Sequence, residues 1–408
     1  MSTISSSTTT TTAYVVTADT TGTLVIQTGA TPTTAVTVGT DQSVALAGNL
    51  TVTGTTTTTG YINVPNTFGF KNRIINGAMV IDQRRAGASV TPADGNYLVD
   101  RWLASLSAAS KYSVQQNAGS VTPPAGFTNY LGVTSLSAYS VGAAESFSLI
   151  QFIEGFNVFD FGFGAAGAST VTLSFWVRSS LTGNFGGALT NGAVNRSYPF
   201  SFSINAANTW EQKSITIAGD TTGTWATNNT SGMGVWFSLG AGSSTTGTAN
   251  VWAASGLRAP TGSVSVVGTN GATFYITGVQ LEKGSTATSF DYRPYGTEFQ
   301  LCQRYYEQWN VTSATYLALG MAYAASDLRT VLQFQVPKRA AATASFSGTV
   351  NFTTASISKS VTSFSFDGTS VNSTLMYNGS QTGLTVGQAL QIQAPGGSSA
   401  TLTFSAEL

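Results

Sequence analysis

The feature that most constrains the fold is a succession of short alternating runs that no long helical repeat interrupts. Runs such as STVTLSFWVRSS (169–180) and ATFYITGVQLE (272–282) alternate apolar with polar residues, and Gly, Ser, Asn and Thr fill the spacers between runs. Alternation is typical of half-buried strands, and Gly- and Asn-rich spacers are typical of turns. We therefore predict an all-β protein built of sandwiches or barrels.

The first part of the chain is leaner than the rest. Residues 1–60 hold 23 Thr and no Lys or Arg, and the first basic residue is Lys71. Short runs at 13–18, 22–29, 34–40 and 43–55 are candidate strands, but they carry too few large apolar side chains to close a core alone. We predict that residues 1–66 form a thin β stalk in which the copies of a homotrimer intertwine and share one apolar seam. The alternative is a flexible low-complexity linker.

Two thicker regions follow. We predict a central β domain over residues 67–296 and a second, smaller β-sandwich over residues 297–408, which forms the tip if the thin end is the attachment end. The segment TEFQLCQRYYEQW (297–309) has apolar residues at both helical and alternating spacings, so the pattern does not decide between helix and strand.

The composition excludes several function classes. Charged residues make up 8 % of the chain against about 25 % in typical soluble domains, and the net charge is zero, so nothing favours binding to nucleic acid. There is no His and a single Cys, Cys302, which removes the common catalytic triads and Cys-rich metal sites. We expect no cofactor, no metal site and no catalytic residues. The chain also lacks an apolar run long enough to span a bilayer, so we expect no membrane insertion.

Two Trp residues lie on strand faces opposite the predicted core. In TLSFWVRS, Leu173, Phe175 and Val177 share one face, and Trp176 lies on the other. The same alternation places Trp236 opposite the apolar face of GVWFSLG (234–240). A flat indole among small polar side chains suits the C–H face of a sugar ring, so we name both residues as candidate carbohydrate-binding residues. The alternative is that each Trp packs under a loop or against another subunit.

Two further Trp residues lie in loop-like segments. Trp225 is in TTGTWATNNTSG and Trp252 is in GTANVWAASG. Loops of this kind carry adaptable recognition surfaces. We therefore add both residues to the candidate carbohydrate-binding set.

One dense group of charges and aromatics ends the central region. In the stretch FYITGVQLEKGSTATSFDYRPYGTE (274–298), we predict that Glu282, Asp291 and Arg293 fix a domain junction or subunit contact through charge-assisted hydrogen bonds. A catalytic alternative pairs Glu282 or Asp291 with another carboxylate as acid and base.

Several motifs of the chain resemble one family. KNRIINGAMVIDQR, YLVDRW, LSFWVRSS, TWEQKSITIAGDTTGTW and FYITGVQLEKGSTATSFDYRPYGTEFQLCQRYY, which together cover about residues 70–306, resemble a module repeated in bacteriophage tail-fibre and virion-appendage proteins. GNLTVTGTTTTTGYINVP resembles the shaft segments that precede that module. The resemblance implies a jelly-roll sandwich similar to carbohydrate-binding modules, in a non-enzymatic and commonly trimeric part of a virion.

The resulting expectation is a virion fibre that is assembled in the host cytoplasm. Its N-terminus would attach to other virion proteins, and its β domains would contact a host surface polysaccharide. One alternative is a capsid or neck decoration fibre with a structural or tethering role. A glycan depolymerase is less favoured, because it needs two carboxylates that face one groove.

Overall fold

The computed structural model describes residues 24–28, 33–38, 44–46, 70–313, 315–354 and 356–408. Internal contacts divide the chain into two units, residues 1–64 and 65–408. In the first unit β1 (Leu24–Thr28), β2 (Thr33–Val38) and β3 (Val44–Leu46) form an antiparallel sheet in that order, where strands were predicted. The predicted strand at 13–18 lies outside the described residues. The structure holds one chain, so the stalk and the homotrimer stay predictions.

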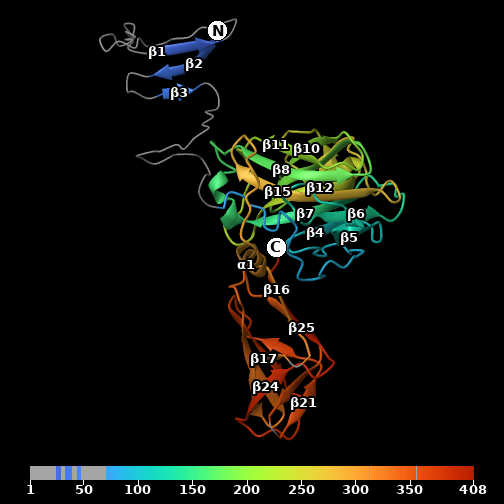
Figure 1. Cartoon of the computed structure of the whole chain (residues 1–408), viewed down its shortest axis with the longest axis vertical. Helices are drawn as coiled ribbons and strands as arrows, with labels where there is room; N and C mark the ends of the chain where they lie inside the picture. Colours follow the sequence, from blue (N-terminus) through green and yellow to red (C-terminus); the bar gives the residue numbers. More distant parts are fainter. Residues whose placement is uncertain (1–23, 29–32, 39–43, 47–69, 314, 355) are drawn as a thin grey trace, which may run out of the picture. The chain divides into compact units, whose positions relative to one another are not determined.

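The central domain is a sandwich of two antiparallel five-stranded sheets, which confirms the all-β prediction (Figure 1). The first sheet has the order β10 (Ser197–Ile204), β9 (Gly183–Asn191), β12 (Ser231–Ala241), β7 (Ser146–Glu154) and β4 (Leu103–Leu106). The second sheet has the order β11 (Glu211–Ile217), β8 (Val171–Ser179), β15 (Thr273–Lys283), β6 (Leu131–Ser135) and β5 (Tyr112–Gln116). The chain passes repeatedly from one sheet to the other, as in a jelly roll.

Minor elements complete this part of the chain. The strands β13 (Thr246–Gly247) and β14 (Ala259–Pro260) form a short parallel pair. Four 3-10 helices occur among the described residues: η1 (Ala118–Ser120), η2 (Gly155–Asn157), η3 (Phe159–Phe161) and η4 (Ser243–Thr245).

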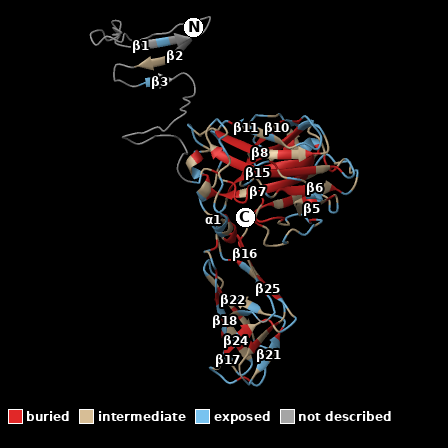
Figure 2. Ribbon diagram, in the orientation of Figure 1, coloured by how far each residue is buried: buried red, intermediate tan, exposed pale blue. Residues whose placement is uncertain are grey.

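The core lies between the two five-stranded sheets, whose strands are mostly buried in Figure 2. Phe175 of β8 packs edge-to-face on Phe237 of β12, with ring centroids 5.0 Å apart, and Trp102 contacts the same Phe237 at 6.1 Å. The alternation that predicted Leu173, Phe175 and Val177 as core residues is confirmed, because all three are buried.

A bulge in β15 changes which side chains face this core. The pairing of β15 with β8 shifts between Thr277 and Gln280, and Gly278 between them has a φ of +60°. Such an extra residue reverses the alternation, and glycine adopts this left-handed conformation at little cost. The buried apolar face therefore continues from Ile276 to Val279, while Gln280 falls on the outer face with Thr277.

The segment with ambiguous spacing forms both elements in turn. Helix α1 (Tyr295–Gln303) crosses the boundary predicted at 296/297, and β16 (Tyr306–Val311) follows it. The remaining strands form a three-stranded and a seven-stranded sheet, so the C-terminal region is all β as predicted. The first has the order β16, β25 (Ala400–Ser405) and β19 (Thr343–Gly348). The second has the order β21 (Ser358–Val361), β20 (Val350–Thr353), β24 (Ala389–Gln393), β17 (Tyr316–Ala324), β18 (Asp327–Gln333), β23 (Ser373–Asn378) and β22 (Ser365–Asp367).

Ion pairs join the central sandwich to the C-terminal region. Arg304, directly after α1, forms a two-bond pair with buried Glu154 at the end of β7, at 2.9 and 2.6 Å. Glu407 near the C-terminus pairs with Arg84 at 2.9 Å and with Arg101. Arg339 donates to the carbonyl oxygens of Asn229 and Glu407. Side chains of the sandwich therefore hold both ends of the C-terminal region.

Candidate functional site

The candidate site forms where the end of β15 and the loop after it meet the segment that precedes the sandwich. Glu282 is buried and organises this loop. Its carboxylate accepts hydrogen bonds from the Thr288 N–H at 2.9 Å, the Thr288 hydroxyl at 2.6 Å and the Gln280 amide at 2.8 Å. These bonds fold residues 284–288 back onto the strand.

Asp291 links the loop to the start of the central domain. Its N–H donates to Gln280 Oε1 at 2.8 Å, and its Oδ2 accepts from the Asn72 N–H at 3.1 Å. Asn72 is buried, and its side chain donates to the Val279 carbonyl at 3.1 Å. A chain segment two hundred residues earlier in the sequence is thereby fixed beside β15.

Arg293 joins the same segment to α1. Its guanidinium pairs with Glu298, in the first turn of the helix, at 3.0 Å, and donates to the carbonyl oxygens of Ile74 and Asn72. Glu298 also accepts from the Asn76 N–H. An acidic side chain in the first turn is also favoured by the helix dipole. The three predicted junction residues, Glu282, Asp291 and Arg293, therefore belong to one bonded region that links residues 72–76, β15 and α1.

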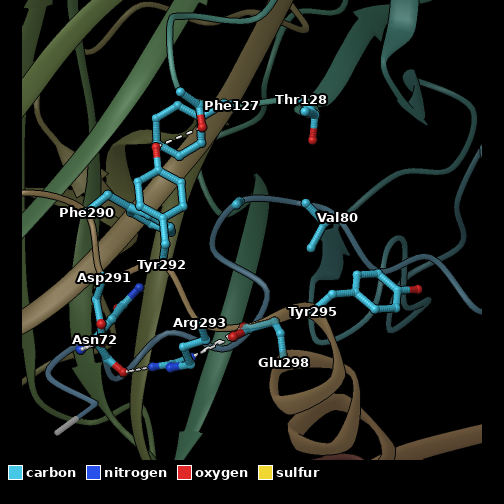
Figure 3. A pocket seen from close by; sticks show the side chains of 12 residues that line it. Asn72, Val80, Phe127, Thr128, Phe290, Asp291, Tyr292, Arg293, Tyr295 and Glu298 are labelled. Carbon is cyan, nitrogen blue, oxygen red and sulfur yellow. Dashed lines mark hydrogen bonds and ion pairs between the residues drawn. The ribbon is translucent and has the colours of Figure 1, made fainter.

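A pocket of about 280 Å³ opens beside this region (Figure 3). Phe127, Phe290 and Tyr292 form an aromatic cluster on one wall, with ring centroids 4.9–5.6 Å apart. In the view of Figure 3, Val80 and Tyr295 lie on the other side. The polar lining includes Asn72, Thr128, Asp291, Arg293 and Glu298.

Glycine makes room for the aromatic wall at two positions. A Cβ at Gly278, in the β15 bulge, would lie 2.6 Å from the Phe127 ring. Gly126 has a φ of +89°, and its carbonyl accepts the Tyr292 hydroxyl at 2.8 Å. A side chain at either position would displace a ring of the pocket.

The pocket can bind a small molecule that has one apolar face and several hydroxyl groups. Its volume of about 280 Å³ lies just below the range of about 300–1,000 Å³ that is typical of ligand sites. The Tyr292 hydroxyl is neutral at pH 7, because the ordinary pKa of Tyr is about 10 and partial desolvation raises the pKa of this group further. A carboxylate has about four acceptor positions, and among the described residues only the Asn72 N–H donates to the Asp291 carboxylate, so this side chain can accept hydrogen bonds from ligand hydroxyls.

The geometry offers little support for acid–base catalysis. Glu282 is buried and bonded to Thr288 and Gln280, so a substrate cannot reach it. Glu298 is held by Arg293 and by the Asn76 N–H. Of the carboxylates in this region, only Asp291 is partly exposed, and a glycosidase mechanism needs two.

Trp236 does not lie on an exposed platform, which corrects the expectation from alternation. It faces away from the main core, as the pattern indicated, but its side chain is only 4 % exposed. Its Nε1–H donates to Thr190 Oγ1 at 3.0 Å, its ring meets Phe152 edge-to-face at 5.9 Å, and Arg258 lies over the ring at 4.1 Å. Neighbouring side chains cover it, so it packs as the alternative interpretation proposed.

The structure brings Trp225 and Trp252 together, although 27 positions separate them in the sequence. Their ring centroids are 5.6 Å apart, and Phe163 packs edge-to-face on both, at 4.8 and 5.9 Å. Each indole donates to a backbone carbonyl, of Thr222 and Ala218 respectively. Both rings are half-buried, so they pack on the sandwich and present only part of their surface.

Trp176 is half-buried on the outer face of β8. The strand register places it between Gln212 of β11 and Thr277 of β15. The carbohydrate-binding role of Trp176, Trp225 and Trp252 stays a prediction.

Sequence reasoning missed most of the aromatic wall of the pocket. Phe290, Tyr292, Tyr295 and Glu298 all lie in the stretch singled out for its density of charges and aromatics, so that density was the available signal. Phe127 comes from a loop more than 160 positions earlier, and no local pattern marks it.

In the described part of the chain, no group of three or more His, Cys, Asp or Glu residues could hold a metal ion. No described helix is long and apolar enough to cross a membrane.

Comparisons with known proteins reveal only distant similarity. No protein-family model matches the sequence, and no curated protein is significantly similar to it. Among solved structures, the enzymatically active domain of tailspike protein 4 of bacteriophage CBA120 aligns at 11 % identity and a TM-score of 0.29, over 52 % of this chain and 21 % of that chain.

Carbohydrate-binding modules align at a similar level. The module TmCBM61, solved with β-1,4-galactotriose, has 12 % identity and a TM-score of 0.28, over 53 % of this chain and 100 % of its own. The family 11 module of the cellulosomal cellulase Lic26A-Cel5E of Clostridium thermocellum has 12 % identity and a TM-score of 0.24, over 50 % of this chain and 98 % of its own. Scores of this size are too low to indicate a shared function.

Proposed function

We propose that this chain is a non-catalytic, glycan-binding fibre of a bacteriophage virion, which attaches to the particle by its N-terminal residues and contacts a host surface polysaccharide through its β domains. The observation that carries the glycan-binding part is the pocket of Figure 3, where aromatic rings and a carboxylate converge. The virion part is supported by the motifs that resemble phage fibre proteins. The fibre is proposed to be a homotrimer.

The pocket is suited to one sugar unit or the end of a glycan. The ring face of Tyr292 can cover the C–H face of a pyranose with Phe290 edge-on beside it, while Asp291 and Thr128 accept hydrogen bonds from its hydroxyls. The low charge of the whole chain favours a neutral or weakly charged polysaccharide, since few side chains are available to neutralise a polyanion.

A glycan array and a titration against purified host polysaccharide test this proposal. We expect Tyr292→Ala to weaken binding at least tenfold, because truncating a central hot-spot aromatic residue costs about 2 kcal/mol or more and tenfold corresponds to about 1.4 kcal/mol. Phe159→Ala is the matched control, since this exposed aromatic does not line the pocket. It should leave binding unchanged.

Two results would contradict the proposed site. Binding that survives Tyr292→Ala but fails in Trp225→Ala or Trp252→Ala would move the site to the other aromatic cluster. A blank array together with no adsorption to host cells would remove glycan binding altogether and favour the decoration fibre. Electron microscopy of the particle, with the chain labelled, would then locate it on the tail, neck or head.

A further inference from the structure

The seven-stranded sheet of the C-terminal region exposes a row of large apolar side chains. Leu319 is 74 % exposed, Val331 58 %, Tyr323 57 % and Met321 45 %. Single exposed apolar residues are normal on a protein surface, but a contiguous group of them marks an interaction site. We refer to Leu319, Met321, Tyr323, Val331 and Leu375 as the apolar face.

The strand register makes these residues neighbours. Met321 of β17 pairs with Arg329 of β18, so the antiparallel register two positions further on brings Leu319 beside Val331, and Thr330 Oγ1 donates to the Leu319 carbonyl at 2.8 Å. Val331 in turn pairs directly with Leu375 of β23. The same residues line one shallow hollow of about 460 Å³. The apolar face therefore crosses three adjacent strands as one surface.

This face offers almost no net charge to a partner. Its one cation, Arg329, forms an ion pair with Asp327 on the same strand at 2.7 Å. The guanidinium also lies 3.7 Å from the centre of the Tyr323 ring and 5.8 Å from that of Tyr377. An acidic or basic partner would find no unpaired charge here, so the complementary surface is apolar and neutral.

We propose that the apolar face is an interface at which copies of this chain pack on one another through the same face. The face is its own chemical complement, because it is apolar and its single cation is already paired. Sheets that pack face to face interdigitate such side chains at a separation of about 10 Å. In a closed rotational assembly such as the proposed homotrimer, each copy can turn this face toward the common axis, so the same residues take part in every contact. The proposal does not depend on glycan binding.

A thiol-labelling experiment on the full chain tests this interface. Val331→Cys places a thiol in the apolar face, and Val251→Cys, 52 % exposed in the central domain, is the matched control. The native Cys302 gives little background, because it is fully buried and burial raises the pKa of its thiol well above the usual value. Labelling by a maleimide is followed by mass spectrometry, and mass photometry counts the copies in the same sample.

We expect an assembly of more than one copy in which the thiol at position 331 reacts at least tenfold more slowly than the thiol at position 251. Adding Leu319→Glu should remove this protection, because the carboxylate cannot be solvated inside an apolar contact. A single-copy mass would overturn the proposal, whether or not the thiol is protected. An assembly in which both thiols react equally fast would overturn it as well, since the copies would then meet elsewhere.

Discussion

The central sandwich and the C-terminal region are both made of β-sheet, but they treat the outer faces of their sheets differently. In the sandwich, outward-facing rings are covered from within the same domain: Tyr275 is buried beside Tyr130, and Trp236 is buried beside Phe152. In the C-terminal region Leu319 and the rest of the apolar face stay open. The chain covers these outer rings in the first domain, whereas it leaves an apolar surface uncovered in the second.

The lengths of the connections explain this difference. The loop between β5 and β6 runs from Asn117 to Tyr130 and is long enough to fold across the second five-stranded sheet, where Ala118 and Tyr130 cover Tyr275. In contrast, β17 ends at Ala324 and β18 begins at Asp327. A two-residue turn holds no chain that could cover the face on either side. Coverage of a sheet is therefore decided by what lies between the strands.

The largest effect should follow from breaking the closed core. Phe237 is fully buried and packs on Phe175, Phe200 and Trp102. We expect Phe237→Ala to lower the unfolding free energy of the central domain by about 3–5 kcal/mol, because the truncation leaves a cavity. Trp fluorescence during denaturant unfolding reports this domain, since all Trp residues except Trp309 precede residue 297.

Val331→Ala is the corresponding truncation on the apolar face. In a single, dissociated copy of the chain it should change the unfolding free energy by no more than about 0.5 kcal/mol, as for ordinary surface positions. A large loss in the single copy would mean that Val331 packs within its own chain. The contrast drawn between the two regions would then be wrong.

An effect as large as that of Phe237→Ala is expected from breaking a charge pair inside the C-terminal region. Lys338 and Glu307 are both fully buried and bonded to each other, and burial lowers the pKa of Lys338. Lys338→Ala should cost about 3–5 kcal/mol of unfolding free energy, because it leaves the Glu307 carboxylate buried without its cation. Denaturant unfolding followed by circular dichroism measures this loss.

The double variant Lys338→Met with Glu307→Gln is the control. It should recover most of the lost stability, since no uncompensated charge remains. A single variant that costs less than about 1 kcal/mol would indicate that water reaches Glu307, and that this region is less tightly closed than the sandwich.

A pH dependence of stability is expected where the central sandwich meets the C-terminal region. Burial is the main cause that raises the pKa of Asp100 from 3.8 to about 6, against the opposing effects of Arg84 and Gln83. Between these two values the folded chain binds more protons than the unfolded chain, so this group makes stability fall as the pH rises. Asp100→Asn should remove that contribution.

The measurement is the difference in unfolding free energy between wild type and Asp100→Asn from pH 4 to pH 7. The stability of the wild type relative to the variant should decline through this range and level off above about pH 6. A difference that stays constant with pH would show that Asp100 is solvated when the regions are joined, which would weaken the coupling described through Arg84 and Glu407.

Much of the fold and part of the site were accessible from the sequence. Alternation identified the strands and assigned Leu173, Phe175 and Val177 to the core, because side-chain direction along a strand follows from backbone geometry alone. The density of charge in 274–298 pointed to the region where Glu282, Asp291 and Arg293 are bonded. The wrong expectation concerned Trp236. Alternation gives the face on which a side chain lies, but it does not say whether another segment covers that face.

The sequence by itself determined that the described part of this chain is built of β-sheet with little helix, where many of its core-facing residues lie, and that the chain has no histidine and a single cysteine. Only the tertiary structure decided that Phe127 joins Phe290 and Tyr292 in one pocket, that Trp225 and Trp252 touch, and that the apolar face stays open. Strand formation depends on neighbours two positions apart, which the sequence displays. Pockets and covered faces depend on contacts between residues far apart in the chain, which appear only when the sheets pack.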